Sequence, residues 1–172
     1  FTITSDDEEY AKILNYYFGK KFMRTLKNVV EDSLNQGTGW IYVYVDDMGE
    51  LSFKRIESYE LNPFWTDSEH ERLDCATRVY PVEVYKENEQ TEIVEKVEVY
   101  SLAGIDQFVL DRGMLKPDEI PHKNYFRVID QASNTAQEYN WKKIPLICFK
   151  SNSKEMPLIK RVKCLQDGIN TM

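Results

Sequence analysis

The side chains most often used in catalysis and metal binding are few in this chain, and they lie in polar turns. The two histidines are His70, within the charged run Asp67-Ser68-Glu69-His70-Glu71, and His122, which follows Pro121. Zinc sites are built from several His and Cys ligands at recurrent spacings. We find no such set around either histidine, so the sequence predicts no metal site.

Motifs for nucleophilic catalysis and for nucleotide binding are also missing. No Gly-x-Ser-x-Gly elbow occurs. A phosphate-binding loop ending at Gly19-Lys20 would need glycine five residues earlier and Ser or Thr afterwards, whereas those positions hold Leu14 and Lys21. Gly37-Thr38-Gly39 comes before a predicted strand, whereas a dinucleotide fingerprint follows a strand and opens a helix. We therefore expect no catalytic residue, no cofactor and no enzymatic activity.

Two groups of neighbouring carboxylates have structural explanations. Asp46-Asp47 precedes Met48-Gly49, which is typical of a hairpin turn. The acidic run Ser5-Asp6-Asp7-Glu8 fits a capping box, with Ser5 as the N-cap and Glu8 at the third helical position. Acidic side chains at a helix start also complement the helix dipole.

The remaining candidate for chemistry is a row of aromatic side chains. Trp40, Tyr42 and Tyr44 alternate along one predicted strand and therefore share one face, which could stack on bases or sugars. This suggests an alternative function, a stand-alone β-rich binding module that holds peptide or glycan. The opposite face carries Ile41, Val43 and Val45, which favours a hairpin packed on both sides.

The elements that position these residues begin with two helices and a hairpin. Apolar residues at helical spacing predict one helix up to Gly19 and a second from Lys20 to Gln36, with Gly37 just past its end. Strand-period residues Trp40 to Val45 and Leu51 to Ile56 then flank a turn in which Gly49 can adopt a positive φ.

The middle of the chain predicts an antiparallel meander. Residues 59–65 indicate an extended connector, because Pro63 blocks a helix, and residues 113–137 indicate a polar excursion loop with one short strand. Pro81 suggests an edge or a bulge in the first strand. The expected strands are Leu73–Tyr85, Thr91–Tyr100, Ile105–Leu110, Tyr125–Ile129 and a buried Ile144–Phe149.

A final helix is predicted from Leu158 to Met172, opened by Pro157. Its apolar stripe, which needs a partner surface, consists of Leu158, Ile159, Val162, Leu165 and Ile169. The fold class is therefore α+β, with an N-terminal helix pair, an antiparallel β-meander of hairpins and a C-terminal helix.

Composition limits the possible partners. The net charge is −7, and residues 37–136 carry 10 basic and 20 acidic side chains, a net of −10. Such a body repels DNA phosphates and does not grip a duplex through counterion release. The longest apolar run has six residues, Trp40 to Val45, too short to span a bilayer, so we expect no membrane association. Three widely spaced cysteines argue against a disulfide framework.

Two groups of motifs, taken in their order along the chain, resemble a family of phage portal proteins. This is the portal family of the long-tailed phages (siphophages) that infect Gram-positive bacteria. The first is a helix followed by Gly37-Thr38-Gly39-Trp40-Ile41-Tyr42-Val43-Tyr44-Val45-Asp46 and then Gly49-Glu50-Leu51-Ser52-Phe53-Lys54-Arg55-Ile56. The second is Glu138-Tyr139-Asn140-Trp141 before Lys143-Ile144-Pro145-Leu146-Ile147 and Phe149-Lys150-Ser151-Asn152. The resemblance covers roughly residues 5–172, and the start at Phe1 leads us to expect a central fragment of a longer chain.

The resemblance implies a structural role in the virion of a phage or prophage. Such portals form a ring, commonly a dodecamer, at one capsid vertex, assembled in the bacterial host cytoplasm. The ring meets the terminase packaging motor, the major capsid or scaffolding protein and the head-tail connector, and double-stranded DNA passes through it. Residues 1–157 would be the wing-like α+β body, and residues 158–172 the start of a channel-directed, stem-like helix. No DNA-binding residue carries over to this chain.

Overall fold

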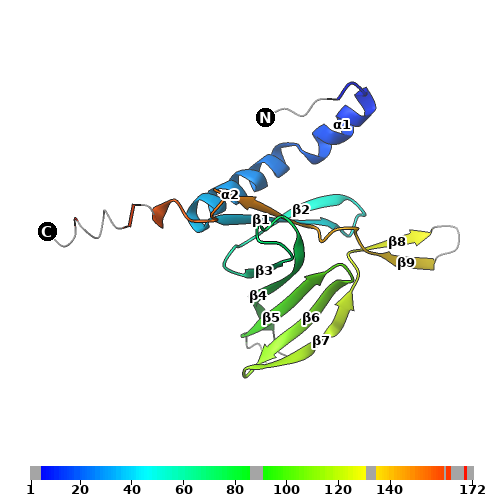
Figure 1. Ribbon diagram of the computed structural model, residues 1–172. Coiled ribbons are helices and arrows are strands. Elements are labelled where there is room, and N and C mark those ends of the chain that lie inside the picture. The colour runs from blue at the N-terminus through cyan, green and yellow to red at the C-terminus, as the bar shows by residue number, and fades with distance from the viewer. Residues whose placement is uncertain (1–4, 86–90, 131–134, 161, 164–168, 170–172) are drawn as a thin grey trace. The chain divides into compact units, whose positions relative to one another are not determined.

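The computed structural model describes residues 5–85, 91–130, 135–160, 162–163 and 169. The chain divides into two compact units (Figure 1). The first, which we call the helical unit, combines residues 1–58 with residues 146–172. The second, which we call the sheet unit, comprises Tyr59–Pro145.

The described residues form two helices and ten strands as continuous elements, and the α+β class is confirmed. In chain order these are α1 (Glu8–Tyr17), α2 (Lys20–Gln36), β1 (Thr38–Val45), β2 (Leu51–Ile56), β3 (Leu61–Trp65), β4 (Leu73–Tyr85), β5 (Thr91–Ser101), β6 (Gly104–Asp111), β7 (Met114–Lys123), β8 (Phe126–Asp130), β9 (Thr135–Tyr139) and β10 (Leu146–Lys150).

The helical unit contains a three-stranded antiparallel sheet in the order β10-β1-β2. At the centre of β1, Trp40 lies opposite Cys148 of β10 and opposite Ile56 of β2. Both outer strands run antiparallel to β1 and are therefore parallel to each other. The connection that leads from β2 past β1 to β10 contains the whole sheet unit, Tyr59–Pro145.

Helix α2 covers one face of this sheet. Val29 is fully buried, and a Cβ atom added at Gly39 would lie only 2.2 Å from the carbonyl oxygen of Val29. Glycine at this position thus lets the helix approach β1 closely. A charge-assisted pair adds a second attachment, because the guanidinium of Arg55 on β2 donates to both carboxylate oxygens of the buried Asp32, with Nη2 to Oδ1 at 2.7 Å.

Helix α1 begins differently from the sequence prediction. Its N-cap is Asp7, whose Oδ1 accepts the backbone N–H groups of Glu9 and Tyr10 at 2.9 and 3.1 Å. Ser5 instead accepts the N–H of Asp7. Both Ser and Asp suit an N-cap, so the sequence alone could not choose between them. The expected start and end of α2, and Gly37 past its end with φ +97°, are confirmed.

The sheet unit contains a five-stranded antiparallel meander in the order β3-β4-β5-β6-β7. The predicted strands at β4, β5 and β6 are confirmed. Pro81 does lie where β4 is an edge, because β3 pairs with β4 only as far as Arg78, and beyond that residue β4 pairs with β5 alone.

Two elements of the sheet unit differ from the prediction. Residues 61–65 form β3 rather than a connector, since Pro63 is tolerated on an edge strand. The predicted excursion loop is largely strand: besides the expected short strand it contains β7, the other edge of the sheet, whose residues are almost all exposed, and the start of β9. Pro117 on β7 pairs opposite Phe108, beside a register shift in β6. In β7, the prolines and the exposure of nearly all side chains removed the period-2 pattern on which the strand prediction relies.

A two-stranded ribbon, β8 with β9, ends the sheet unit. The short strand expected near Tyr125–Ile129 is confirmed as β8. The motif residue Asn140 lies at the base of this ribbon, where its side-chain nitrogen donates to the carbonyl of Ala103 and to Asn124 Oδ1, at 2.7 and 2.6 Å. The amide of Asn140 also accepts the N–H of Tyr125, whose hydroxyl donates to the Ser101 carbonyl. Asn140 therefore ties the ribbon to the meander.

The end of the chain falls partly outside the described residues. A strand near Ile144–Phe149 is confirmed as β10, but it is the edge of its sheet, and Ile147 is exposed rather than buried. The predicted C-terminal helix is not established, because residues 161, 164–168 and 170–172 lie outside the described residues. Leu165 of its stripe is among them.

Candidate functional site

The residues singled out for chemistry do not come together. His70 lies in a tight turn with φ +57°, its ring stacked on Trp65, and His122 Nδ1 lies 2.7 Å from Asp106 on β6. Within the described residues, no group of three or more His, Cys, Asp or Glu side chains could hold a metal ion. Cys75 and Cys148 are free thiols, and burial raises the pKa of Cys148 to about 12.

Asp46 has the turn role that the sequence predicted. One of its carboxylate oxygens accepts the N–H groups of Met48 and Glu50, both at 3.0 Å, and the other accepts the hydroxyl of Ser52. These hydrogen bonds, the one from Glu50 above all, hold the pKa of Asp46 below its usual range. Gly49 completes the turn with φ +80°.

The aromatic row on β1 does not form an open stacking platform. Trp40 is 1% exposed, and so is Ile41 on the opposite face, which confirms that this part of the hairpin packs on both sides. Tyr42 and Tyr44 are half-buried and stack on each other, with ring centroids 5.6 Å apart. The alternative function, a stand-alone binding module, therefore cannot use Trp40 as a contact residue.

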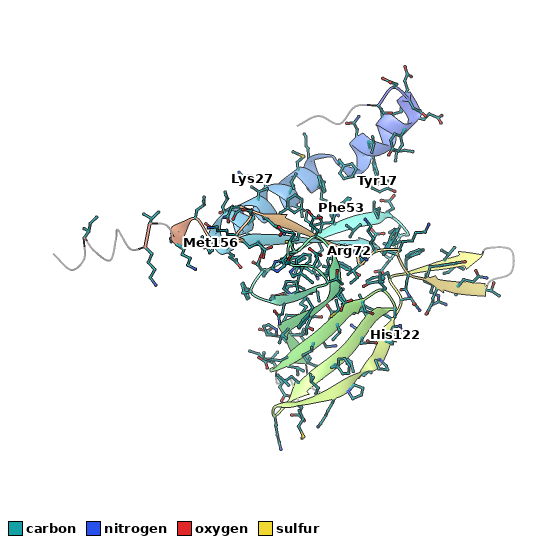
Figure 2. The ribbon with its side chains drawn as sticks, viewed as in Figure 1. Tyr17, Lys27, Phe53, Arg72, His122 and Met156 are labelled. Atoms are coloured by element: carbon teal, nitrogen blue, oxygen red, sulfur yellow. The ribbon has the colours of Figure 1, made fainter. Side chains whose placement is uncertain are left out.

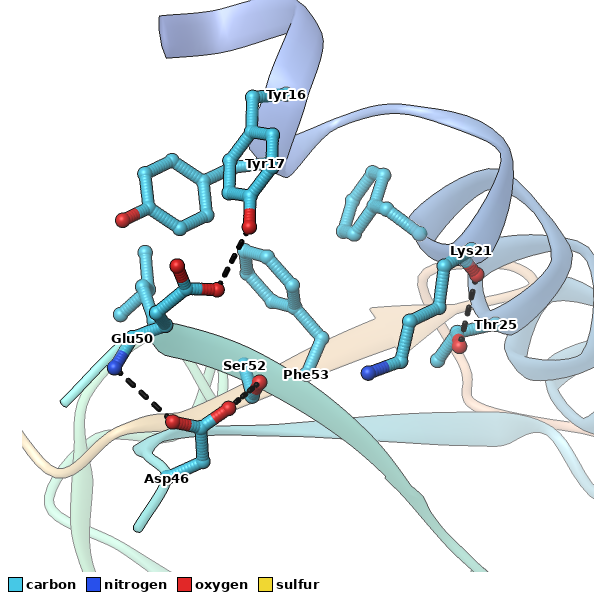
Figure 3. Close-up of a pocket in the computed structure, with 10 residues that line it drawn as sticks. Tyr16, Tyr17, Lys21, Thr25, Asp46, Glu50, Ser52 and Phe53 are labelled. Atoms are coloured by element: carbon cyan, nitrogen blue, oxygen red, sulfur yellow. Dashed lines mark hydrogen bonds between the residues drawn. The ribbon is translucent and has the colours of Figure 1, made fainter. Parts of the chain in front are cut away.

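A pocket of about 230 Å³ lies within the helical unit (Figure 3). It is lined by the end of α1, the start of α2 and the β1–β2 turn; the lining residues are Tyr16, Tyr17, Lys21, Phe22, Thr25, Asp46, Glu50, Leu51, Ser52 and Phe53. The Tyr16 hydroxyl donates to Glu50 at 2.7 Å, and this contact raises the pKa of Tyr16. Sequence reasoning missed this pocket because its walls come from three elements that no motif connects.

The chain returns to α2 immediately after β10. The N–H of Ser151 donates to the Gly37 carbonyl at 3.0 Å, and the N–H of Leu158 donates to the Leu34 carbonyl at 2.9 Å. A Cβ atom added at Gly37 would lie 2.0 Å from the carbonyl oxygen of Glu155. Figure 2 shows Met156 of this segment beside the end of α2. We call residues 151–158 the exit segment, because it leads the chain out of β10, the last strand, and is anchored on the end of α2.

The exit segment is held by its own side chains as well. Asn152 Oδ1 accepts the N–H of Lys154, and Asn152 Nδ2 donates to the Met156 carbonyl at 2.7 Å. Lys150 Nζ lies 3.0 Å from Glu155. Beyond this anchored turn the apolar side chains are exposed: Leu158, Ile159, Val162 and Ile169. Leu158 at the end of the exit segment, and Ile159, Val162 and Ile169 after it, are therefore apolar side chains that the described residues leave uncovered.

Comparison with known proteins identifies the family of this chain. The sequence profile of the family described as "Phage portal protein, SPP1 Gp6-like" matches residues 1–172. The chain belongs to this family of phage portal proteins. It is 22% identical over 174 residues to the portal protein of Bacillus phage SPP1, a match that covers 99% of this chain.

The chain spans about a third, 33%, of the length of that SPP1 portal protein. The resemblance found in the sequence is thereby confirmed, and the structure explains which residues carried it. Gly37, Gly39 and Trp40 are packing positions between α2, the exit segment and β1, and Asn140 holds the ribbon. These four motif residues thus serve close packing or hydrogen bonding between elements. In the described part of the chain no helix is both long and apolar enough to cross a bilayer.

Proposed function

We propose that this chain is the body of a portal subunit, which in the full-length protein assembles into a closed ring at one vertex of the capsid. The match of the portal family to all residues of the chain is the observation that carries this proposal. The ring serves DNA packaging and DNA passage, and it provides the attachment point for the tail connector. The role is structural, without catalysis.

The exit segment supports a division of labour within the subunit. Residues 1–157 form the wing-like body, and residues 158–172 begin a stem-like helix directed toward the channel. Two backbone hydrogen bonds, to Leu34 and Gly37, and the tight fit at Gly37 hold the exit segment against the end of α2. A ring subunit needs such a fixed exit, because twelve helices can line one channel only if each leaves its body at the same angle.

The acidic middle of the chain suits a conduit component. Residues 37–136 carry a net charge of −10, so they repel a passing duplex rather than retain it. The partners are further copies of the subunit in a ring of twelve, the terminase motor, the major capsid or scaffolding protein and the head-tail connector. The assembled ring is a virion component, built in the host cytoplasm.

Sedimentation velocity and electron microscopy of the full-length protein test this proposal. We expect closed rings at micromolar concentration, whereas residues 1–172 alone stay monomeric or associate weakly, because an isolated helix of the length of 158–172 is marginal without a partner. A full-length protein that stays monomeric at tens of micromolar, with no rings in micrographs, would refute the portal role for this chain and favour the binding module.

A further inference from the structure

Helix α1 presents a face that the described residues do not cover. None of its residues is buried, and Tyr10 and Ile13 are 53% and 52% exposed. At 100° per residue, Tyr10, Ile13 and Glu9 fall on one side of the helix. Asp6 and Asp7 lie directly before the helix, and Glu8 and Glu9 form its first turn. The α1 face is therefore acidic at its start and apolar one turn further along.

Helix α2 presents the complementary pattern in the same order. Lys20, Arg24 and Lys27 recur at i, i+4 and i+7, on the side opposite the buried Val29, and all three are exposed. Figure 2 shows Lys27 on the side of α2 away from the sheet. Val30 and Leu34 follow on the flank of this row, 42% and 40% exposed. The α2 face is thus basic first and apolar afterwards.

No ion pair between described residues neutralises either set of charges. Among the described residues, the side chains of Lys20, Arg24 and Lys27 form no ion pair, and the same holds for the carboxylates of Asp6 and Glu9. Opposite charges on two exposed helix faces favour their mutual contact and specify its orientation.

The register of the two faces matches only if the helices run parallel. Glu9 precedes Ile13 by four residues, about 6 Å at 1.5 Å per residue. Lys27 precedes Val30 and Leu34 by three and seven residues, about 4.5 and 10 Å. Parallel docking therefore places acid on base and apolar on apolar together. Helices α1 and α2 follow one another with only Phe18 and Gly19 between them. Such a short connection cannot return along the helix, so the two cannot pack side by side in parallel, and the partner must be another molecule.

We propose that α1 of one copy docks on the outer face of α2 of the next copy, with Asp6 and Glu9 on Arg24 and Lys27, and with Tyr10 and Ile13 on Val30 and Leu34. The inference rests on the proposed portal function, since it names one interface of that ring. The two faces are different patches of the same chain, so the contact is heterologous and can be repeated around a closed ring.

Charge reversal in the full-length protein tests the contact. The double variants Asp6→Lys/Glu9→Lys and Arg24→Glu/Lys27→Glu each place like charges opposite each other, and we expect each alone to need at least about tenfold more subunit for ring formation. Mixed one to one, they restore opposite charges at every interface of an alternating ring. We therefore expect the mixture, followed by sedimentation velocity, to recover assembly close to wild type.

Matched variants separate the contact from general effects of charge. Glu8→Lys changes the same first turn of α1 on another side of the helix, and Lys54→Glu changes an exposed position of β2. Both should assemble like wild type. Circular dichroism of the monomeric variants before assembly checks that α1 and α2 remain folded, and higher salt should weaken wild-type assembly by screening.

The outcomes distinguish this contact from the portal role. Wild-type protein that forms no ring refutes the proposed function itself. Rings that form equally well in all variants refute the α1–α2 contact and leave the portal role standing. Assembly that is lost in the variants but not recovered on mixing also refutes it. Normal assembly with weaker binding of a short DNA duplex by Arg24→Glu/Lys27→Glu would refute it too, and would assign the basic row to DNA.

Discussion

At the scale of single residues, two glycines with similar backbone angles have different roles. Gly37 and Gly49 both have positive φ, +97° and +80°. A Cβ atom at Gly37 would collide with the backbone of Glu155, whereas at Gly49 nothing lies within 4 Å. Both positions follow an obvious sequence signal, a helix end and a hairpin turn, but only the tertiary structure shows that Gly37 also seats the exit segment.

This difference gives a matched pair of substitutions. Gly49→Ala should lower the free energy of unfolding by about 1–2 kcal/mol, the cost of a left-handed conformation for alanine. Gly37→Ala should cost at least about 1–3 kcal/mol for its backbone conformation alone, with the collision against Glu155 added. Urea titration of both variants measures the difference. Equal losses would show that the exit segment moves away without cost.

At the scale of elements, a buried charge network joins β4, β5 and the turn that precedes β3 in the sheet unit. The Arg78 guanidinium on β4 lies 2.7 Å from Glu60 and 3.7 Å from Glu98 of β5, with its side chain 10% exposed. Glu98 also accepts hydrogen bonds from the hydroxyls of Tyr80 and Tyr100, at 3.1 and 2.6 Å. Arg78 further lies over the ring of Tyr80 at 3.9 Å. These buried side-chain contacts thus stabilise the pairing of β4 with β5.

Removing the cation should leave the buried carboxylate of Glu60 without its ion-pair partner, and that of Glu98 with only the more distant Lys123, whose Nζ lies 3.9 Å away. Arg78→Met is expected to cost about 3–5 kcal/mol of unfolding free energy near pH 7, the range for a broken buried ion pair. Arg127→Met, at an exposed position of β8, is the control and should change stability by less than about 0.5 kcal/mol. Urea titration measures both. A loss at Arg78 as small as the control would mean that water reaches the carboxylates.

The same network predicts how stability depends on alkaline pH. Burial, and then the carboxylate of Glu98, raise the pKa of Tyr80 from 10.0 to about 12. Between these values the folded chain retains a proton that the unfolded chain has lost, so stability falls as the pH rises from about 10 to about 12. Below pH 10 the contribution is fully present.

Substitution of Tyr80 isolates this titration from the other tyrosines. Tyr80→Phe should show a smaller loss of unfolding free energy than wild type between pH 9 and pH 11.5, measured by urea titration at each pH. The comparison uses the slope, because loss of the hydroxyl contact with Glu98 also lowers stability at neutral pH. Identical slopes would show that Tyr80 ionises equally in both states.

At the scale of the whole molecule, the chain is a small helix-and-sheet body with a second unit inserted into it. Tyr59–Pro145 leaves after β2 and returns at β10, the two strands that flank β1. Each unit has its own sheet and its own buried residues, such as Ile41 in the helical unit and Ile105 in the sheet unit. This organisation indicates that each unit folds separately.

Excision of the inserted unit tests that independence. Replacing residues 59–145 by a Gly/Ser linker of about ten residues, with a root-mean-square span of about 16–19 Å, should bridge β2 and β10 across β1. We expect the variant to retain helical circular dichroism and a cooperative thermal transition, and Tyr59–Pro145 expressed alone to do the same with a β-type spectrum. Loss of cooperative unfolding in either piece would show that the units stabilise each other.

The sequence by itself determined the elements whose signals are local. The span of α2, the hairpin with Gly49 and the strands β4 to β6 follow from side-chain periodicity and from turn residues, because those forces act between near neighbours in the chain. The family resemblance also came from the sequence. It depends on the order along the chain of motifs such as Gly37-Thr38-Gly39-Trp40, and not on where these motifs lie in the structure.

Only the tertiary structure decided the rest. The edge strand β7 is exposed and contains two prolines, so it lacks the alternation that marks a strand, and the edge strand β3 has a proline at its centre. The partner of β1 on its second side, β10, lies over a hundred residues away, and pairing across such a distance leaves no local pattern. The exit segment on Gly37, the Glu98 network and the exposed faces of α1 and α2 are relations between elements. Packing between elements therefore decided which of these faces stay exposed.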